Sequence, residues 1–193
     1  MANKYMDTAF VDKAIKFAVD AHANTERRGK GFPYVIHVLE AMEIVSTITN
    51  DPELLAAAVL HDTVEDTDVT VEQIRAEFGE RVAMLVHDET TEMIAGMSES
   101  DSWRMRRQSS VDRLAKASHD AKIVAMGDKL SNMRAIAHDY RQIGEELWKR
   151  FHAPKGKLDY AWYYKSMGEA LGELADTDAH AEYTTLCHCV FDK

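Results

Sequence analysis

Cysteine, proline and glycine are all scarce in this chain, whose 193 residues include two cysteines, three prolines and nine glycines. Proline and glycine are the residues that most disfavour helix interiors, so their scarcity beside abundant alanine, glutamate, methionine and leucine favours a helical protein. The two cysteines, Cys187 and Cys189, flank His188. Without further cysteines to complete a metal site we interpret this Cys-x-Cys as structural, and low cysteine use fits a reducing compartment.

The chain also lacks any apolar run near the roughly 20 residues that a membrane-spanning helix needs. Residues 1–7 do not contain the apolar core of a signal peptide. We therefore predict a cytoplasmic protein that does not bind membranes. A length of 193 residues makes one domain the default expectation.

Basic residues are outnumbered, because 23 lysines and arginines face 33 aspartates and glutamates, for a formal net charge of −10 at pH 7. Nucleic-acid binding requires a basic surface that displaces counterions, so this balance argues against a nucleic-acid partner. A small anionic ligand is still compatible, because several basic residues lie close to the motifs described below. A separate basic cluster is interpreted as ordinary surface charge and consists of Lys149, Arg150, Lys155 and Lys157.

Apolar residues recur at helical spacing along nearly the whole chain, and no stretch alternates with a period of two, so we predict an all-α bundle of about nine or ten helices. Asp51 followed by Pro52 has the pattern of a helix N-cap with proline at the first helical position. Thr70 and Gln73 have the form of a capping box. Residues 97–102 are expected to form a polar connector. Helices are expected over residues 103–117 and 119–138, with two more within residues 157–190.

The most informative segment is His-Asp-Thr-Val-Glu-Asp-Thr, which begins at His61 and follows an apolar run at residues 54–60 that is typical of a helix buried on every side. A histidine and three carboxylates at the end of a buried helix are costly unless something compensates them, as a divalent metal would. If the helix continues, Asp62, Glu65 and Asp66 share one face. The alternative is a solvated acidic helix end. Three other His-Asp pairs occur, at His87, His119 and His138.

Two further segments carry candidate metal ligands. A basic, glycine-rich loop at residues 27–36 leads into His37, and an apolar helical run at residues 123–134 is interrupted by Asp128. Taken alone, the histidine fits a core or capping role and the aspartate a solvated one. Together with the His-Asp pair they provide two imidazoles and two carboxylates, a suitable ligand set for Mn²⁺ or another borderline divalent ion.

Three motifs in this order resemble the HD superfamily of metal-dependent phosphohydrolases and, more narrowly, the hydrolase domain of the RelA/SpoT-type alarmone enzymes and their small stand-alone relatives. The motifs are the Arg-rich loop into Pro33-Tyr34-x-x-His37, the block His61-Asp62-x-x-Glu65-Asp66-Thr67, and the run Asp128-Lys129-Leu130-Ser131-Asn132-Met133-Arg134. They span residues 28–134, over half of the chain. The chain departs from the family pattern at positions that are not predicted ligands and bear on nucleotide preference: Gly29, Val38 and Ala135.

The resemblance implies a single HD-type phosphohydrolase domain over residues 1–193, with helices within residues 157–190 packing on the motif core. It implies that one Mn²⁺ per chain is held by four ligands: His37, His61, Asp62 and Asp128. Glu65 and Asp66 would orient or deprotonate the attacking water. The substrate would be guanosine tetra- or pentaphosphate, which loses its 3′-diphosphate to give GDP or GTP and pyrophosphate.

The resemblance also implies the residues that bind the nucleotide. Arg28 would stack on or flank the base, with Lys30 in the same loop, and Asn132 would contact the nucleoside. Lys129 and Arg134 would lie near the phosphates or brace the metal-bearing helix. Longer family members carry a synthetase domain after the hydrolase, and this chain ends too soon to contain one, so we expect it to degrade the alarmone and not to make it.

Two alternatives stay open. A generic HD nucleotidase or phosphodiesterase would use the same metal ligands on another nucleotide, but it need not have the Glu65-Asp66 pair or the Arg28 loop. A nucleotide sensor would bind without turnover, and it would be expected to show damage to the metal set. The sequence leaves the oligomeric state undecided.

Overall fold

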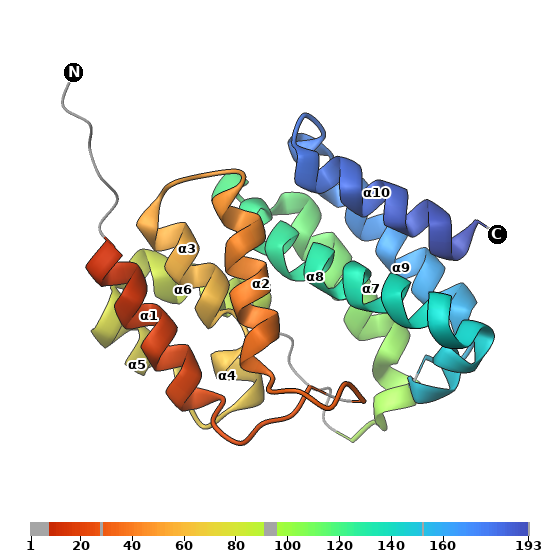
Figure 1. The fold of residues 1–193 in the computed structure, drawn as a ribbon, viewed down its shortest axis with the longest axis horizontal. Coiled ribbons are helices and arrows are strands. Elements are labelled where there is room, and N and C mark those ends of the chain that lie inside the picture. Colours follow the sequence, from red (N-terminus) through yellow and green to blue (C-terminus); the bar gives the residue numbers. More distant parts are fainter. Residues whose placement is uncertain (1–7, 28, 91–95, 152, 193) are drawn as a thin grey trace. The chain divides into compact units, whose positions relative to one another are not determined.

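In a computed structural model, the chain is described over residues 8–27, 29–90, 96–151 and 153–192. This part of the chain contains ten α-helices, two 3-10 helices and no β-strand (Figure 1). Glu26 and Pro33 form an isolated antiparallel bridge. The predicted all-α fold of about nine or ten helices is confirmed. None of the helices over these residues has both the length and the apolar character required to cross a membrane.

The chain divides into two compact units, one comprising Met1–Thr90 and Ile123–Asp128 and the other Thr91–Lys122 and Lys129–Lys193. The long helix α8 (His119–Ile143) contributes residues to both. The prediction of one domain over the whole chain therefore stays a prediction.

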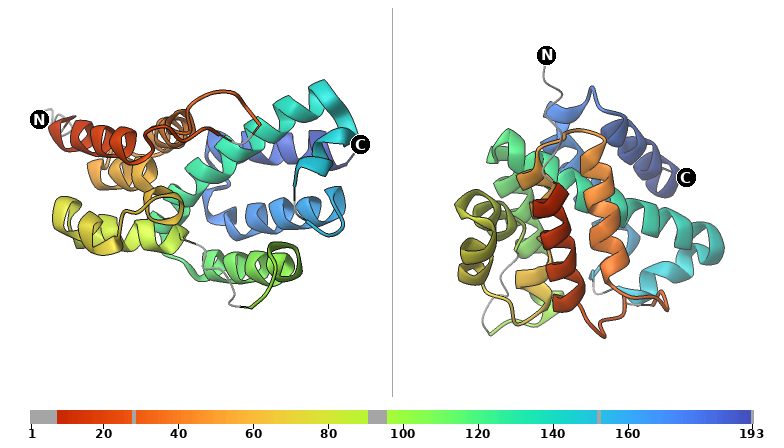
Figure 2. Two further views of the ribbon diagram at one scale, coloured as in Figure 1. Left: turned by 90° about the horizontal axis from the view of Figure 1, so that it is seen from below. Right: turned by 60° about the vertical axis from the view of Figure 1, so that its left-hand side comes forward.

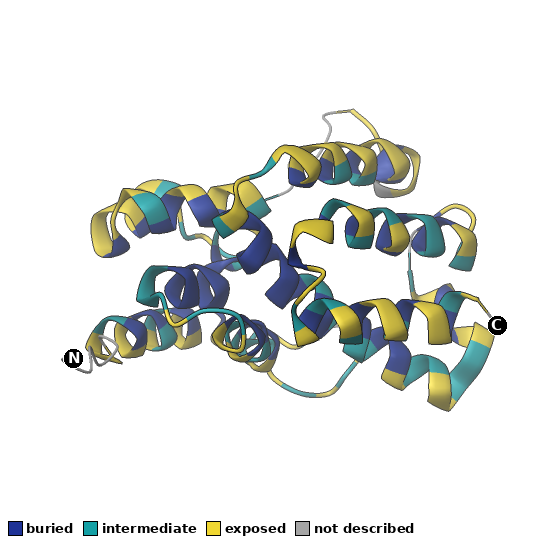
Figure 3. Cartoon of the chain, turned by 90° about the horizontal axis from the view of Figure 1, so that it is seen from above, coloured by how far each residue is buried: buried dark blue, intermediate teal, exposed yellow. Residues whose placement is uncertain are grey.

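The first unit is built around α3, which packs most extensively against α1, α2 and α6 (Figure 1). Its helices are α1 (Thr8–Ala21), α2 (Val35–Ser46), α3 (Pro52–Leu60), α4 (Thr63–Asp66), α5 (Val71–Phe78) and α6 (Glu80–Glu89), with part of α8. Residues 54–60 of α3 are all buried, as the sequence predicted. Figure 3 shows buried residues in dark blue and exposed ones in yellow along the helices. A helix that is apolar all round is stable only inside a core, which explains the central position of α3.

The predicted start signals of the helices are confirmed. The Asp51 carboxylate accepts a hydrogen bond from the backbone N–H of Glu53, and Pro52 occupies the first turn of α3. At the start of α5, Thr70 and Gln73 form the reciprocal bonds of a capping box. These bonds satisfy backbone donors that would otherwise have no partner at a helix start.

Gly127 lets α8 approach α2 closely within the first unit. A Cβ atom at this position would lie 2.5 Å from the carbonyl oxygen of Ala41 and 2.9 Å from a methyl group of Val45. The backbone oxygen cannot turn aside as a flexible side chain would. Because Asp128 is the next residue, the glycine also sets how near Asp128 comes to the histidine carried by α2.

We expect Gly127→Ala to lower the free energy of unfolding by about 1–3 kcal/mol through overpacking, although alanine is the better helix former. Thermal melting followed by circular dichroism would measure the loss. Gly172→Ala is the matched control, because a Cβ there meets no atom within 4 Å. Equal melting temperatures for the two variants would contradict this account of the contact between α8 and α2.

The second unit contains both ends of α8 together with α7 (Glu99–Lys116), η1 (Gly144–Arg150), α9 (Lys157–Ala170), η2 (Gly172–Leu174) and α10 (Asp178–Phe191). Helix α9 contacts both α7 and α10 (Figure 2). Aromatic rings fill much of the core, where Trp103 of α7 lies 5.4 Å from Tyr160, centroid to centroid. The buried Tyr183 hydroxyl donates a hydrogen bond to the carbonyl oxygen of Tyr164 at 2.7 Å.

Several helix boundaries differ from the sequence-based expectation, among them the end of α8, which lies at Ile143 and not at residue 138. Helix α7 begins at Glu99, inside the expected connector, because the Ser98 hydroxyl caps it by accepting from the N–H of Asp101. The helix that approaches the His-Asp pair ends at Leu60, and α4 starts only at Thr63. The pair itself therefore lies in a turn between two helices.

Candidate metal centre

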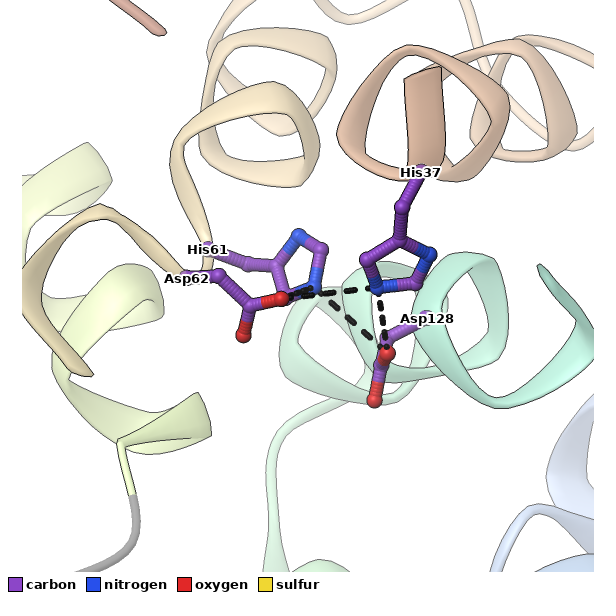
Figure 4. Close-up of side chains that lie close together, drawn as sticks. All are labelled: His37, His61, Asp62 and Asp128. Carbon is purple, nitrogen blue, oxygen red and sulfur yellow. Dashed lines mark ion pairs between the residues drawn. The ribbon is translucent and has the colours of Figure 1, made fainter. Parts of the chain in front are cut away.

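Three elements of the first unit bring four side chains together. His37 comes from the first turn of α2, His61 and Asp62 from the turn between α3 and α4, and Asp128 from α8 (Figure 4). Each offers one donor atom, and all four donor atoms lie within 4.8 Å of one another. Three of the side chains are buried and Asp62 is half-buried. These are the four ligands that the family resemblance implied.

The donor spacing fits a single ion. The Nε2 atom of His61 lies 2.9 Å from Oδ2 of Asp62 and 3.5 Å from Oδ1 of Asp128. The Nε2 atom of His37 lies 3.4 Å and 3.2 Å from the same two oxygens. Ligand atoms held about 2.1 Å from one ion lie roughly 3.0–3.5 Å apart in octahedral or tetrahedral geometry. The four separations therefore require little adjustment to enclose a metal.

The hydrogen bonding of His61 prepares it as a ligand. Its Nδ1 lies 2.8 Å from the carbonyl oxygen of Ala58, and because a carbonyl only accepts, Nδ1 carries the proton. In the neutral ring the lone pair is then on Nε2, which faces the carboxylates. That buried Nε2 lies 2.9 Å from Oδ2 of Asp62 but does not meet the geometry of a hydrogen bond among the described residues. Facing two carboxylates, it favours a positive charge, which a proton supplies in the absence of a metal and which a bound divalent ion would supply in its place.

The charges of the cluster point to a cation. Burial alone would raise the pKa of Asp62, but the His61 and His37 rings outweigh it and hold that pKa well below its usual range. Burial likewise would lower the pKa of His61, but Asp62 and Asp128 raise it well above the ordinary value. Both shifts show that the carboxylates favour positive charge between them. Two carboxylates with two neutral imidazoles match the charge and ligand preference of a borderline divalent ion.

The two predicted catalytic carboxylates lie on α4, directly beyond the cluster. The N–H of Asp66 donates to the carbonyl oxygen of Asp62 at 2.9 Å, so the helical relation between these two residues holds across the turn. Glu65 and Asp66 are exposed and line an open pocket of about 620 Å³ that also includes Thr25. Although the residue is exposed, neighbouring atoms partly desolvate the Asp66 carboxyl group, and this desolvation, followed by the charge of Asp62, raises its pKa. A carboxylate with a raised pKa is a better proton acceptor.

The predicted nucleotide contacts are only partly described. Arg28 lies outside the described residues. Lys30 is half-buried in the loop before α2, where the Gly31 N–H donates to a Glu26 carboxylate oxygen at 3.0 Å. Gly29 and Gly31 have φ values of +71° and +70°, a left-handed backbone that glycine adopts without strain.

Lys129, Asn132 and Arg134 continue α8 after Asp128 and belong to the second unit. The Arg134 guanidinium makes two 2.7 Å hydrogen bonds to the carboxylate of Glu182 in α10. Such a two-point pair holds the guanidinium in one orientation. Of the two roles predicted for Arg134, the contact favours bracing of the metal-bearing helix.

Sequence reasoning did not assign a site role to Tyr34 or His22. The Tyr34 hydroxyl donates a 2.6 Å hydrogen bond to Oδ2 of Asp62. The His22 ring is buried and lies 5.0 Å from the Tyr34 ring, centroid to centroid. Because Tyr34 lies one helical turn before His37, its position in the sequence could have indicated that it is near the site. The position of His22 depends on the packing of α1 and carried no such signal.

The fold and the donor set together define an all-helical protein with a histidine–aspartate centre for a divalent metal. Residues 14–156 match the HD domain family. The chain belongs to that family, as the sequence motifs indicated.

Relatives of the chain include proteins named as hydrolases and others named as putative GTP diphosphokinases. It is 37% identical over 133 residues to guanosine-3′,5′-bis(diphosphate) 3′-pyrophosphohydrolase MESH1 of Danio rerio, an alignment that covers 67% of this chain and 70% of that protein. It is 44% identical over 80 residues to guanosine-3′,5′-bis(diphosphate) 3′-pyrophosphohydrolase of Aquifex aeolicus, which covers 42% of this chain and 11% of that protein. The chain thus spans most of one relative and a small part of the other.

A solved structure has the same fold. It is described as a metazoan ortholog of SpoT that hydrolyzes ppGpp and plays a role in starvation responses. The two proteins superpose with a TM-score of 0.72 at 25% identity, over 92% of this chain and 93% of that one.

Proposed function

We propose that the chain is a Mn²⁺-dependent hydrolase that removes the 3′-diphosphate of guanosine tetra- or pentaphosphate and yields GDP or GTP with pyrophosphate. The observation that carries the proposal is the cluster of His37, His61, Asp62 and Asp128. It occurs in a chain whose relative MESH1, matched over 70% of its length, is named for this reaction. Membership of the HD domain family supports the metal dependence.

The mechanism follows from the arrangement of the first unit. The two histidines and two aspartates of the cluster would hold the ion. When bound, Mn²⁺ supplies a Lewis acid that polarises the phosphoryl group and lowers the pKa of a water molecule. Asp66 takes the proton of the attacking water and Glu65 orients that water. The water oxygen bonds to the phosphorus on O3′, the P–O3′ bond breaks, and O3′ takes up a proton to become a hydroxyl.

Recognition of the guanosine moiety is assigned to the loop before α2 and to the later part of α8. Arg28 is proposed to stack on the base, because a planar guanidinium covers a purine face better than an ammonium does. Lys30 and Lys129 supply positive charge for the phosphates, and Asn132 contacts the nucleoside. Gly29 and Ala135 depart from the family pattern, so we expect weaker discrimination among 3′-phosphorylated nucleotides.

Incubation with a nucleotide panel in the presence of Mn²⁺ tests the substrate. We expect pyrophosphate release from guanosine tetra- and pentaphosphate, and no comparable product from 5′-monophosphates or cyclic dinucleotides. Arg28→Ala should mainly raise KM, and Arg28→Lys should recover little of the loss. Cleavage of a 5′-monophosphate or cyclic dinucleotide, with 3′-diphosphates left intact, would support the alternative of a general HD nucleotidase or phosphodiesterase. Tight binding of the alarmone without any product would support a sensor.

The remaining expectations rest on the sequence. Low cysteine use supports a cytoplasmic location, and the negative net charge supports a small nucleotide over a nucleic acid as the partner. Self-association is compatible with the proposal and is not needed by it.

A further inference from the structure

Tyr34 makes a short side-chain contact to the metal cluster. Its hydroxyl donates to Oδ2 of Asp62 at 2.6 Å. The same oxygen faces both imidazoles, at 2.9 Å from Nε2 of His61 and 3.4 Å from Nε2 of His37. A carboxylate oxygen has two lone pairs, so one is used by the tyrosine while the other is directed toward the imidazoles.

The backbone places Tyr34 for this contact. It directly precedes α2 with helical angles, φ −58° and ψ −35°, and its carbonyl oxygen accepts from the N–H of His37 at 2.9 Å. One turn of chain thus supplies both a metal-ligand candidate and a hydrogen bond to a second one, Asp62. Any shift of this turn would move both groups together.

Neighbouring rings hold the Tyr34 side chain in place. The His22 ring packs against it at 5.0 Å with an interplanar angle of 33°, and the His37 ring meets it edge-on at 5.6 Å and 80°. The Arg27 guanidinium lies 5.7 Å from the ring centroid. With its ring contacted on several sides, the hydroxyl has little freedom to leave Asp62.

The geometry makes the hydroxyl the donor of this bond, because the ionised carboxylate oxygen that it meets at 2.6 Å can only accept.

We propose that Tyr34 is a positioning residue of the metal centre, whose hydroxyl fixes the Asp62 carboxylate so that Oδ2 faces the space between His37 and His61. A carboxylate rotates easily about its terminal bond, because that torsion is broad. The hydrogen bond restricts this rotation before the metal binds, so metal binding carries a smaller entropic cost. The inference rests on the proposed function only in requiring a metal at this site.

The test compares the affinity for Mn²⁺ alone, measured by competition with a chelating dye, in the wild type, Tyr34→Phe and Tyr183→Phe. Phenylalanine keeps the ring packing and removes only the donor. Loss of an outer hydrogen bond of this kind typically weakens metal binding by about 10- to 100-fold, and we expect that loss for Tyr34→Phe. Tyr183→Phe removes a buried tyrosine hydrogen bond in the other unit, so it should bind Mn²⁺ as the wild type does.

Replacement of Tyr34 by 4-aminophenylalanine provides the second variant, because it keeps a donor at the same ring position. It should recover most of the lost affinity, and Co²⁺ bound to it should have the visible absorption spectrum of the wild type. Wild-type affinity in Tyr34→Phe would overturn the positioning role, as would a 4-aminophenylalanine variant no better than phenylalanine. A wild-type protein that binds no Mn²⁺ would overturn the metal centre itself, a result distinguishable from failure of the Tyr34 role alone.

Discussion

Replacing Asp128 with asparagine is expected to remove the metal from the protein and to lower the rate of hydrolysis by more than about 100-fold. Mutation of residues that only support metal ligands lowers affinity or activity by up to about 100-fold, so loss of a ligand itself should have a larger effect. The amide keeps the shape of the side chain, so the contact between α8 and α2 at Gly127 should persist. It removes a negative charge from a cluster whose His37 and His61 nitrogens lie 3.2 Å and 3.5 Å from Oδ1 of the aspartate. Without that charge the site loses half of the carboxylate pair that favours a divalent ion.

Elemental analysis after dialysis, together with an assay of pyrophosphate release, measures this effect. Asp139→Asn is the matched control, since Asp139 is a half-buried aspartate of the same helix and pairs with Arg150 at 3.7 Å. It should keep both the metal and the activity. An Asp128→Asn protein with normal metal content would show that the cluster does not hold the ion.

The second large effect concerns Asp66, whose replacement by asparagine should lower kcat by about 10²- to 10⁴-fold, the range typical of a lost general base. Asparagine cannot accept the proton of the attacking water. The metal content and the affinity for substrate should change little, because Asp66 lies beyond the cluster, on α4. Steady-state kinetics with metal analysis separates these quantities.

Glu65→Gln provides the comparison within the same pocket. A smaller loss of kcat than in Asp66→Asn would agree with a role in orienting the water. Glu72→Gln, an exposed carboxylate in the first turn of α5, serves as the control and should leave both constants unchanged. If the two pocket variants raise KM without lowering kcat, these carboxylates bind substrate and do not take part in proton transfer.

Local signals account for the parts of the fold that could be predicted. The start of α3 at Asp51 and Pro52 and that of α5 at Thr70 are determined by side chains within a few residues of the backbone groups they satisfy. The burial of α3 on every side was readable from its apolar run. In contrast, the end of α3 at Leu60 depends on how the turn carrying the His-Asp pair faces α2 and α8, which no local pattern encodes.

The candidate site, like the fold, could be predicted from the sequence only in part. His37, His61 and Asp62 could be selected because their motifs combine with helical spacing and a family resemblance, and the structure brings them together with Asp128. Their binding of a metal stays a prediction until it is measured. The bond from Tyr34 to Asp62 could not be predicted, because it joins residues 28 positions apart through tertiary packing.

The pairing of Arg134 with Glu182, which is 48 positions away, could not be predicted from the sequence either. Sequence reasoning identified the arginine and left two roles open for it. The packing of α10 supplies the carboxylate that pairs with it, and the role of Arg134 stays a prediction.

The most direct test of a metal-dependent alarmone hydrolase is pyrophosphate release from guanosine tetraphosphate by chelator-stripped wild-type protein, measured before and after addition of one equivalent of Mn²⁺. We expect negligible release from the stripped protein and full recovery on addition of Mn²⁺, with equal amounts of GDP and pyrophosphate. Undiminished release from protein shown by elemental analysis to be free of metal would contradict this expectation.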